Sequence, residues 1–423
     1  MPRESAMSIE TSTSTSANVA EVDIFDPRWW VDGPPHELFA RLRAEAPVHW
    51  YQNPDGTGYW SVFRHADIHR ISHDSETFSS ARGGVYINPD QVVPLDVMRT
   101  MMLVMDPPQH TRYRKILAKV FTPASVAKLE EGIRARVTRT IDKFIETGSC
   151  DFVSDVAVPI PLGVLMELMG VPEDDMQTWF DWTERIEKAV RVSESSAALD
   201  VFGEMGGYLA QQIERQTTEA VEDSLVMRLR NAEVDGEQLN ELEIVAVFGL
   251  LAFAGNDTTR NTTATGLLTL LNHPEALQEL YADPSLLPGA IEEILRWTTV
   301  VQWFARTATR DVEVGGKAIA EGDKIVMWYG SGSRDEAVFA DADTFDIHRP
   351  KPDHQAFGGG GRHFCLGASL ARLELRVTFE EILRRMKDIE LAGTPELVPS
   401  HWAHGLSAMP IRFTPGPRLG LDD

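Results

Sequence analysis

Cysteine and basic residues are both scarce in this sequence of 423 residues. Only two cysteines occur, Cys150 and Cys365, so the chain carries no disulfide framework and suits a reducing compartment such as the cytoplasm. The 64 acidic side chains outnumber the 40 basic ones and give a formal net charge of −24. A negative charge of this size argues against nucleic acid or an anionic membrane as the general partner.

Long hydrophobic runs and internal repeats are also missing. The longest apolar run, residues 244–255, is shorter than the ~18 residues that a membrane-spanning helix requires. Residues 1–20 are polar, lack the apolar stretch of a signal peptide, and are expected to form a disordered tail. No linker divides the remainder, so we expect a single domain over residues 21–423, without a membrane anchor and located in the cytoplasm.

Helical periodicity dominates the middle of the chain. Residues 239–271 read as one long helix, and most of the sequence from residue 123 to that point has helical spacing. Residues 311–327 alternate instead and turn at glycines, which predicts hairpin strands, and short strands return near residues 409–413. The predicted fold is mainly α with a small β region.

The segment most informative about function is FGGGGRHFCLG, residues 357–367. Its glycines allow the backbone to approach a flat or bulky group closely. A helical pattern follows Cys365, so the dipole and free N–H groups of a helix N-terminus are expected to stabilise its thiolate. One thiolate on such a cradle suits an axial bond to haem iron, whereas structural zinc needs four ligands. An inert buried thiol, a plain helix cap and a phosphate loop are the alternatives.

A polar segment, NDTTRNTT at residues 256–263, interrupts the long predicted helix. Ala254 and Gly255 remove side-chain bulk just before it, which would let a planar group or a ligand lie against the helix. Asp257 and Thr258 offer a carboxylate and a hydroxyl, the elements of a short proton relay. The competing interpretation is a kinked helix whose threonine hydroxyls bond the preceding carbonyls.

Several charged residues are candidates for binding carboxylates. His110 and Arg114 are four residues apart and share one helix face, where they could grip the carboxylates of a haem. Arg306 and His363 are further candidates of this kind, and a solvated basic face is the alternative.

A second set of charged residues is expected to support the fold. Glu293 and Arg296 lie three residues apart and can pair within one helical turn, a pairing that contributes little if it is exposed. Arg349 could complete a buried network with them.

Taken together, these residues resemble the cytochrome P-450 family of haem-thiolate monooxygenases, in particular its soluble bacterial members. The resemblance extends from about residue 22 to the C-terminus. It is carried by AGNDTT at residues 254–259, Glu293-x-x-Arg296, FDIHR ending at Arg349, and the Cys365 loop. In this family the residues matched by Glu293, Arg296 and Arg349 form a structural triad.

The resemblance implies haem b, iron protoporphyrin IX, held between the long central helix and the helix after the cysteine loop. Cys365 matches the proximal iron ligand, and Asp257 and Thr258 match the acid–alcohol pair that delivers protons during oxygen activation. The remaining positions expected to contact the cofactor are His110, Arg114, Ala254, Arg306, Gly361, His363 and Gly367.

The cysteine loop departs from the commonest family pattern in one respect. The loop phenylalanine usually lies seven residues before the cysteine, but Phe357 lies eight before Cys365, and Gly358 holds the usual place. The loop looks one residue longer, a variation associated with a bacterial subgroup that acts on sterols and branched lipids. The role of Phe357 is left open by this shift.

The resemblance also implies the reaction, which is insertion of one atom of O2 into a C–H bond of a hydrophobic substrate, such as a sterol side chain, a terpenoid or a branched lipid. The chain lacks a flavin or nicotinamide fingerprint, so a ferredoxin and its NAD(P)H-dependent reductase are expected to supply electrons. A basic patch for this partner is expected from Arg112, Arg114, Arg362, Arg372 and Arg376. The alternatives are a peroxide-driven peroxygenase and a haem sensor without turnover.

The candidate substrate pocket is mainly apolar, which suits a hydrophobic molecule. Its expected residues are Leu250, Val300, Val301, Trp303 and Leu406. Residues 83–102 are expected to form a mobile lid over it.

Overall fold

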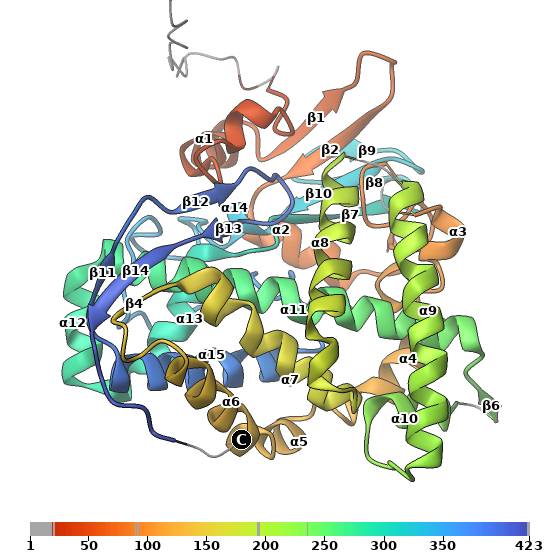
Figure 1. Ribbon diagram of the computed structural model, residues 1–423. Helices are drawn as coiled ribbons and strands as arrows, with labels where there is room; N and C mark the ends of the chain where they lie inside the picture. Colours follow the sequence, from red (N-terminus) through yellow and green to blue (C-terminus); the bar gives the residue numbers. More distant parts are fainter. Residues whose placement is uncertain are drawn as a thin grey trace, which may run out of the picture.

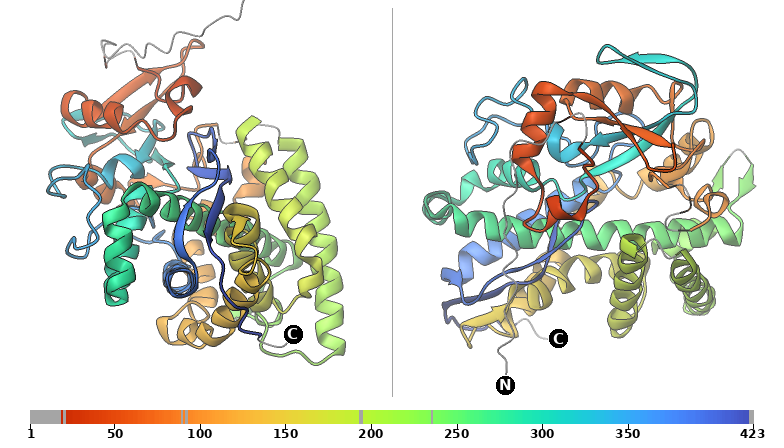
Figure 2. Two further views of the ribbon diagram at one scale, coloured as in Figure 1. Left: turned by 60° about the vertical axis from the view of Figure 1, so that its left-hand side comes forward. Right: turned by 90° about the horizontal axis from the view of Figure 1, so that it is seen from above.

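A long central helix, α11 (Glu241–Asn272), crosses the molecule, and the other helices and the sheets are arranged around it (Figure 1 and Figure 2). The structure is a computed structural model that describes residue 19 and residues 22–88, 90, 93–192, 195–234 and 236–420. Apart from Val19, the predicted N-terminal tail lies outside the described residues.

The helices account for most of the regular structure. The other α-helices are α1 (His36–Glu45), α2 (His65–His73), α3 (Leu95–Met98), α4 (Gln109–Ala118), α5 (Pro123–Ala127), α6 (Glu130–Asp142), α7 (Pro159–Met169), α8 (Met176–Val192), α9 (Ser195–Thr218), α10 (Leu225–Arg230), α12 (Pro274–Ala282), α13 (Leu287–Thr298), α14 (Tyr329–Gly332) and α15 (Ala368–Arg385). Shorter helical turns are η2 (Pro27–Trp30), η3 (Met102–Val104), η4 (Val153–Ala157), η5 (Glu173–Asp175) and η6 (Pro284–Leu286).

The strands form one larger sheet and several small ones. The larger sheet has the order β1-β2-β10-β7-β3 and contains β1 (Val48–Gln52), β2 (Gly58–Val62), β3 (Phe78–Ser79), β7 (Trp303–Ala308) and β10 (Lys324–Trp328). The smaller sheets contain β4 (Ser149–Asp151), β5 (Glu233–Val234), β6 (Glu237–Gln238), β8 (Val312–Val314), β9 (Lys317–Ile319), β11 (Lys387–Leu391), β12 (Glu396–Val398), β13 (Gly405–Ala408) and β14 (Pro410–Thr414). The fold is thus mainly α with a small β region, as predicted.

The long helix begins where the sequence supplies a capping box. The Asn240 side chain accepts a hydrogen bond from the Glu243 N–H at 3.0 Å, and the Glu243 carboxylate accepts one from the Asn240 N–H at 2.9 Å. The helix predicted over residues 239–271 is therefore confirmed, with small shifts at its ends. Helices α7, α8, α9, α13 and α15 pack against it.

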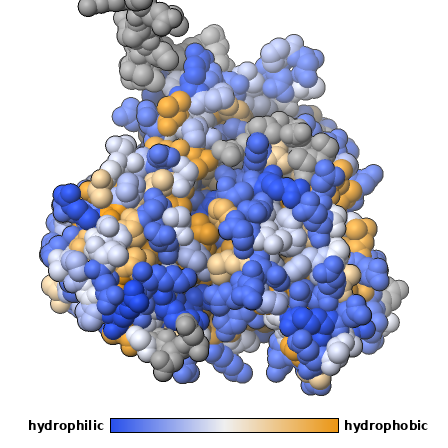
Figure 3. All heavy atoms as spheres, in the orientation of Figure 1, coloured by the Kyte–Doolittle hydropathy of each residue, from blue (hydrophilic) through white to orange (hydrophobic). Residues whose placement is uncertain are grey.

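Burial explains the apolar character of α11. By length and composition it could cross a membrane, since its most apolar window has a mean hydropathy of 1.3, but 50% of that window is buried inside the protein. A helix surrounded by other helices needs no polar face. The outer face of the molecule drawn in Figure 3 is mainly hydrophilic.

The larger sheet joins segments that are distant in the sequence. β10 runs parallel to β2 and antiparallel to β7, so the N-terminal strands lie beside strands from the second half of the chain (Figure 1). The hairpin predicted within residues 311–327 is present as β8 and β9, which turn at Gly315 and Gly316 with φ of +54° and +77°. β10 leaves that hairpin and enters the larger sheet.

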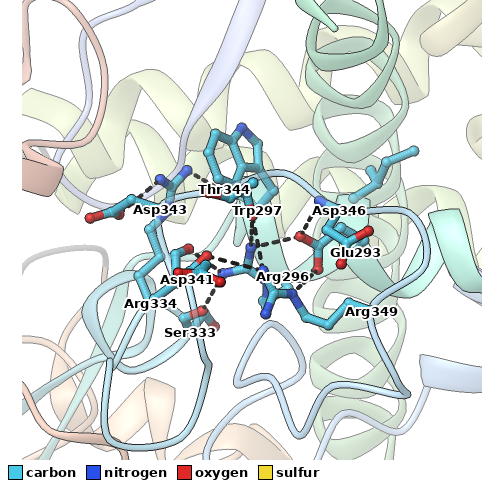
Figure 4. Close-up of polar contacts among 12 residues, drawn as sticks. Glu293, Arg296, Trp297, Ser333, Arg334, Asp341, Asp343, Thr344, Asp346 and Arg349 are labelled. Atoms are coloured by element: carbon cyan, nitrogen blue, oxygen red, sulfur yellow. Dashed lines mark hydrogen bonds and ion pairs between the residues drawn. The ribbon is translucent and has the colours of Figure 1, made fainter. Parts of the chain in front are cut away.

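The carboxylate of Glu293, on α13, is the centre of a buried polar network (Figure 4). It accepts hydrogen bonds from Arg296 Nε at 2.8 Å, from Arg296 Nη2 at 2.7 Å and from Arg349 Nε at 3.1 Å. Arg296 Nη1 donates further to the carbonyls of Ser333 and Ala342. The expected association of Glu293, Arg296 and Arg349 is present, and it ties residues 333–349 to α13.

Replacing Arg296 by methionine is expected to lower the free energy of unfolding by about 3–5 kcal/mol, because Glu293, only 1% exposed, loses most of its charge compensation. Unfolding in denaturant, followed by circular dichroism, measures the loss. The matched control is Arg228→Met, which removes an exposed ion pair with Asp223 and should change stability by less than about 1 kcal/mol. Equal effects of the two substitutions would contradict the stabilising role of the network.

Candidate functional site

A cavity of about 300 Å³ lies between α11, β7, the segment around residues 86–103 and the cysteine loop. Its walls are mainly apolar side chains, and the cysteine loop before α15 contributes Cys365 to its lining. In Figure 1 the larger sheet lies on one side of α11 and α15 on the other. The cavity therefore brings the polar segment of α11 and the cysteine loop to one space, as the sequence analysis required.

The cysteine loop is built on glycines that other residues could not replace. Gly358, Gly360 and Gly361 have φ of +88°, +88° and +69°, a region that L side chains rarely adopt. A Cβ on Gly361 would lie 2.1 Å from the backbone oxygen of Ser72 in α2. The loop thus packs directly on α2, and the Cys365 N–H closes it by donating to the Phe357 carbonyl at 3.0 Å.

The longer loop explains the displaced phenylalanine. Gly358, at the usual place of that residue, has a left-handed conformation that would strain a phenylalanine. Phe357 instead lines the cavity and lies under the guanidinium of Arg372, whose Cζ is 4.5 Å from the ring centroid. The extra residue is therefore absorbed by a glycine turn, and the ring still reaches the cavity.

Burial raises the pKa of the Cys365 thiol above its usual value. Hydrogen bonds from the N–H groups of Gly367 and Ala368, and the charges of Arg114 and Arg372, act in the opposite direction without overcoming burial. The expectation that the helix N-terminus alone would favour the thiolate is thus only partly met. The thiol is accessible, and the surface that it exposes faces the cavity.

The four candidate carboxylate donors converge on the cavity. His110, Arg114, Arg306 and His363 all line it, and the rings of His110 and His363 lie 4.2 Å apart. Burial lowers the pKa of His110 to about 4 and that of His363 well below its usual value, so both imidazoles are neutral at pH 7. Each neutral ring can still donate one hydrogen bond.

This donor set fits an anionic group. His110 Nε2 is buried without a hydrogen-bond partner, and Arg306, only 4% exposed, donates to the neighbouring Ala305 carbonyl at 2.8 Å. Among the described residues, neither Arg114 nor Arg306 forms an ion pair. Guanidinium groups in this state, buried in Arg306 and partly exposed in Arg114, are suited to carboxylates supplied by a bound molecule, and the two propionates of haem meet that requirement.

The polar segment of α11 has features of both interpretations of its sequence, threonine hydroxyls that bond preceding carbonyls and an acid–alcohol pair. Thr258 Oγ1 donates to the Ala254 carbonyl at 2.9 Å, and Thr262 and Thr263 bond back in the same way. Asp257 and Thr258 nevertheless both line the cavity. The back-bonding threonines and the acid–alcohol pair are therefore features of the same helix.

Asp257 belongs to a charged cluster that the sequence analysis did not identify. One of its oxygens lies 2.5 Å from Arg260, which also pairs with Glu184 at 2.7 Å and with Glu187 at 3.4 Å. Both glutamates come from α8. The three-residue spacing of Asp257 and Arg260 was a signal for the first pair, but the acids of α8 are distant in sequence.

The structure corrects two of the pocket assignments. Leu250, Val300 and Val301 line the cavity, but Trp303 and Leu406 do not. Side chains alternate along β7, so Phe304 faces the cavity while Trp303 packs against Phe25 and Trp328. Leu406, 1% exposed, is part of the apolar core that includes residues of α6, α13 and α15.

The cavity also contains residues that were not assigned to it. Tyr86 and Met101, from the proposed lid, line it together with Phe202, Phe253 and Trp402. Phe253 lies one turn before Asp257 and could have been found by helical spacing, whereas Trp402 is brought in by tertiary structure alone.

The predicted basic cluster is weaker than its sequence suggests. Arg372 pairs with Glu292 at 2.5 Å, and Arg376 pairs with Glu130 at 2.6 Å and with Glu380 at 2.9 Å. Carboxylates therefore offset the charge of these two arginines.

Comparisons with known proteins agree with this site. A family model described as cytochrome P450 matches residues 173–408. The methyl-branched lipid omega-hydroxylase of Mycobacterium tuberculosis is 36% identical over 434 residues, covering 96% of this chain and 100% of that protein. The steroid C26-monooxygenase of Mycolicibacterium smegmatis is 36% identical over 406 residues, covering 93% and 94%.

A solved structure also matches this chain over most of its length. Mycobacterium marinum cytochrome P450 CYP268A2 in complex with pseudoionone matches with a TM-score of 0.84 and 35% identity, covering 94% of this chain and 100% of that one. The chain belongs to the cytochrome P450 family. It is a cytochrome P450 monooxygenase, and the family and fold imply a haem-thiolate cofactor.

Replacing Arg306 by leucine is expected to weaken haem retention by about ten- to a hundredfold, because a charge-assisted hydrogen bond to a propionate is lost. Transfer of haem to apomyoglobin measures the rate of loss. Arg310→Leu is the control, since Arg310 follows the same strand, β7, but donates to Thr77 outside the cavity. Haem loss from the Arg306 variant at the rate of the control would show that Arg306 does not hold the cofactor.

Proposed function

We propose that the protein hydroxylates a hydrophobic molecule, a sterol side chain, a terpenoid or a methyl-branched lipid, with electrons from a ferredoxin and its NAD(P)H-dependent reductase. The observation that carries the proposal is the Cys365 thiol in the lining of an apolar cavity that also contains Asp257 and Thr258. The relatives described above are named as lipid and steroid oxygenases, and the mainly apolar lining suits the same classes of substrate.

Each cavity group has a proposed task in holding haem b. Cys365 would supply a thiolate ligand, and Ala254 and Gly367, which line the cavity, would leave room for close approach of the macrocycle. Gly361 was predicted to contact the cofactor, but it lies outside this lining and packs against Ser72 of α2. The propionates are held by His110, Arg114, Arg306 and His363. When bound, the haem activates O2 with two electrons and two protons, so that one oxygen atom enters a C–H bond and the other leaves as water.

The polar centre of α11 is proposed to manage protons. The Thr258 hydroxyl donates to the Ala254 carbonyl at 2.9 Å, and rotation of the hydroxyl away from this carbonyl would direct its proton into the cavity. Asp257 is joined through Arg260 to Glu184, whose side chain is 44% exposed, so a line of charged groups leads from the cavity wall to solvent. The Arg260 guanidinium keeps its proton, so the Asp257 carboxylate is the group proposed to renew the proton at Thr258.

Location and domain structure are part of the same proposal. We infer a cytoplasmic protein in which residues 21–423 form one haem domain. Docking of an acidic ferredoxin is proposed at the cluster of Arg112, Arg114, Arg362, Arg372 and Arg376, in which acids offset part of the charge of Arg372 and Arg376.

The difference spectrum of the dithionite-reduced protein with carbon monoxide tests the cofactor assignment. A strongly red-shifted Soret band is expected for the wild type and should be lost in Cys365→Ala, because only the thiolate produces it. Cys150→Ala is the matched control and should keep the band, since Cys150 pairs in β4, away from the cavity. A band of the ordinary histidine type in the wild-type protein would overturn the assignment.

Product formation tests the reaction. Thr258→Ala is expected to keep consuming NAD(P)H while hydroxylated product per NAD(P)H falls by roughly tenfold or more, because a positioned proton donor is lost. The control is Thr265→Ala, which removes a hydroxyl bonded to the Asn261 carbonyl on the same helix, outside the cavity lining. Undiminished coupling in the Thr258 variant would refute the relay, and turnover with peroxide alone would favour a peroxygenase.

A further inference from the structure

The outer face of α2 carries two histidines whose rings are in contact. His69 and His73 are four residues apart, so they lie on the same face of this helix. Their rings are stacked, with centroids 3.9 Å apart and planes 27° apart. Both residues are exposed, and neither lines the cavity. We call His69 and His73 the histidine pair.

The first member of the histidine pair is available as a metal ligand. Partial burial and the charges of His73 and His65 lower the pKa of His69, although the charge of Asp353 acts in the opposite direction. The imidazole of His69 is therefore mainly neutral at pH 7. A neutral imidazole has a lone pair on one ring nitrogen, and metal ions bind histidine through that lone pair.

The second member is already oriented. His73 Nδ1 lies 2.8 Å from the His69 carbonyl, and His73 Nε2 accepts a hydrogen bond from the Gly361 N–H at 3.1 Å. A carbonyl oxygen can only accept, so Nδ1 carries the proton and Nε2 presents the lone pair. Metal-binding histidines are commonly held in this way, with the other ring nitrogen donating to a backbone carbonyl.

The two imidazoles select the kind of metal ion. Imidazole nitrogen suits Zn²⁺, whereas Mg²⁺ and Ca²⁺ prefer oxygen. Two histidines four residues apart on one helix face are also the spacing by which helices supply two ligands to zinc. Among the described residues no third histidine, cysteine or carboxylate completes the group, and His65 bonds the Asp353 carbonyl instead. Water would fill the other zinc positions, so an open, reversible site is expected.

The nitrogen that would bind zinc also serves the cysteine loop. His73 Nε2 accepts the N–H of Gly361, and a Cβ on Gly360 would lie 2.4 Å from His73 Cε1. The loop therefore packs on the histidine pair as well as on the backbone of α2. One lone pair cannot accept this N–H and bind a metal ion at the same time. Zinc at His73 and the Gly361 hydrogen bond thus exclude one another.

From these contacts we propose that His69 and His73 form a zinc site on α2, and that zinc bound there releases the Gly361 N–H and loosens the cysteine loop. The coupling is reciprocal, so the free energy of the Gly361 bond is subtracted from zinc binding. The zinc site itself is independent of the proposed function. Its effect on haem retention rests on the haem assignment made there.

Calorimetric titration of the haem-loaded protein with Zn²⁺ tests the site. His69→Ala and His73→Ala are each expected to weaken zinc binding by about tenfold or more, because one of two protein ligands is lost. The matched control is His348→Ala, which removes an exposed histidine bonded to Glu279 at 2.7 Å and should keep the affinity. Absence of zinc binding in the wild type, or equal affinity in the wild type and both variants, overturns the site.

Transfer of haem to apomyoglobin, with and without Zn²⁺, tests the link to the loop. Zinc is expected to speed haem loss from the wild type by about two- to tenfold, the range of one net hydrogen bond. The His69→Ala variant keeps the His73–Gly361 bond and should show little response. Zinc that binds the pair without changing haem loss overturns the link. The carbon monoxide spectrum judges the proposed function separately, because zinc binding through both histidines in a protein without the thiolate band refutes the haem assignment and not the site.

Discussion

The buried carboxylate of Glu293 is the interaction on which the cysteine site depends. Between the end of α14 and the start of α15 the described chain contains neither helix nor strand, yet this stretch carries Cys365. Ladders of backbone hydrogen bonds therefore cannot position it. Glu293 does so at one end by holding Arg296 and Arg349, which in turn bind the carbonyls of residues 333–344 (Figure 4).

The same stretch is fixed at its other end by close packing. Gln355 donates to the His65 carbonyl of α2 at 3.0 Å, and residues 359–361, all glycines, approach α2 too closely for any side chain. The thiol is thus placed by a charge network and by steric contact. Burial raises the pKa of the Cys365 thiol in this setting, and a bound metal cation would favour the thiolate again.

Local pattern made part of this predictable from sequence. Helical spacing predicted α11 nearly to the residue, and the unusual chemistry of the cysteine loop and of the polar segment of α11 directed attention to residues that do share a cavity. The register of strand β7 was the main source of error in predicting the pocket residues. Trp303 and Phe304 are equally apolar neighbours, and only the placement of β7 in the sheet decides which of them faces the cavity.

Contacts between residues that are distant in the sequence could not be predicted either. Nothing in the local sequence of α8 indicates that Glu184 and Glu187 share Arg260 with Asp257, or that Trp402 closes the cavity beside Phe253. Conversely, Arg372 and Arg376 look free in the sequence but pair with acids from α13, α6 and their own helix. These facts depend on which helices become neighbours, and not on the residues next to them in the chain.

The shared guanidinium of Arg260 couples the position of α8 to the charge of Asp257 on α11. It divides its charge between an acid on α11 and two acids on α8, so any displacement of α8 changes how much of that charge Asp257 receives. Linkage is reciprocal, which means that a change in the charge of Asp257 must shift the preferred position of α8 by the same free energy. The position of α8, which contributes Ile186 to the cavity lining, and the charge of Asp257 in the same lining are therefore governed by one equilibrium.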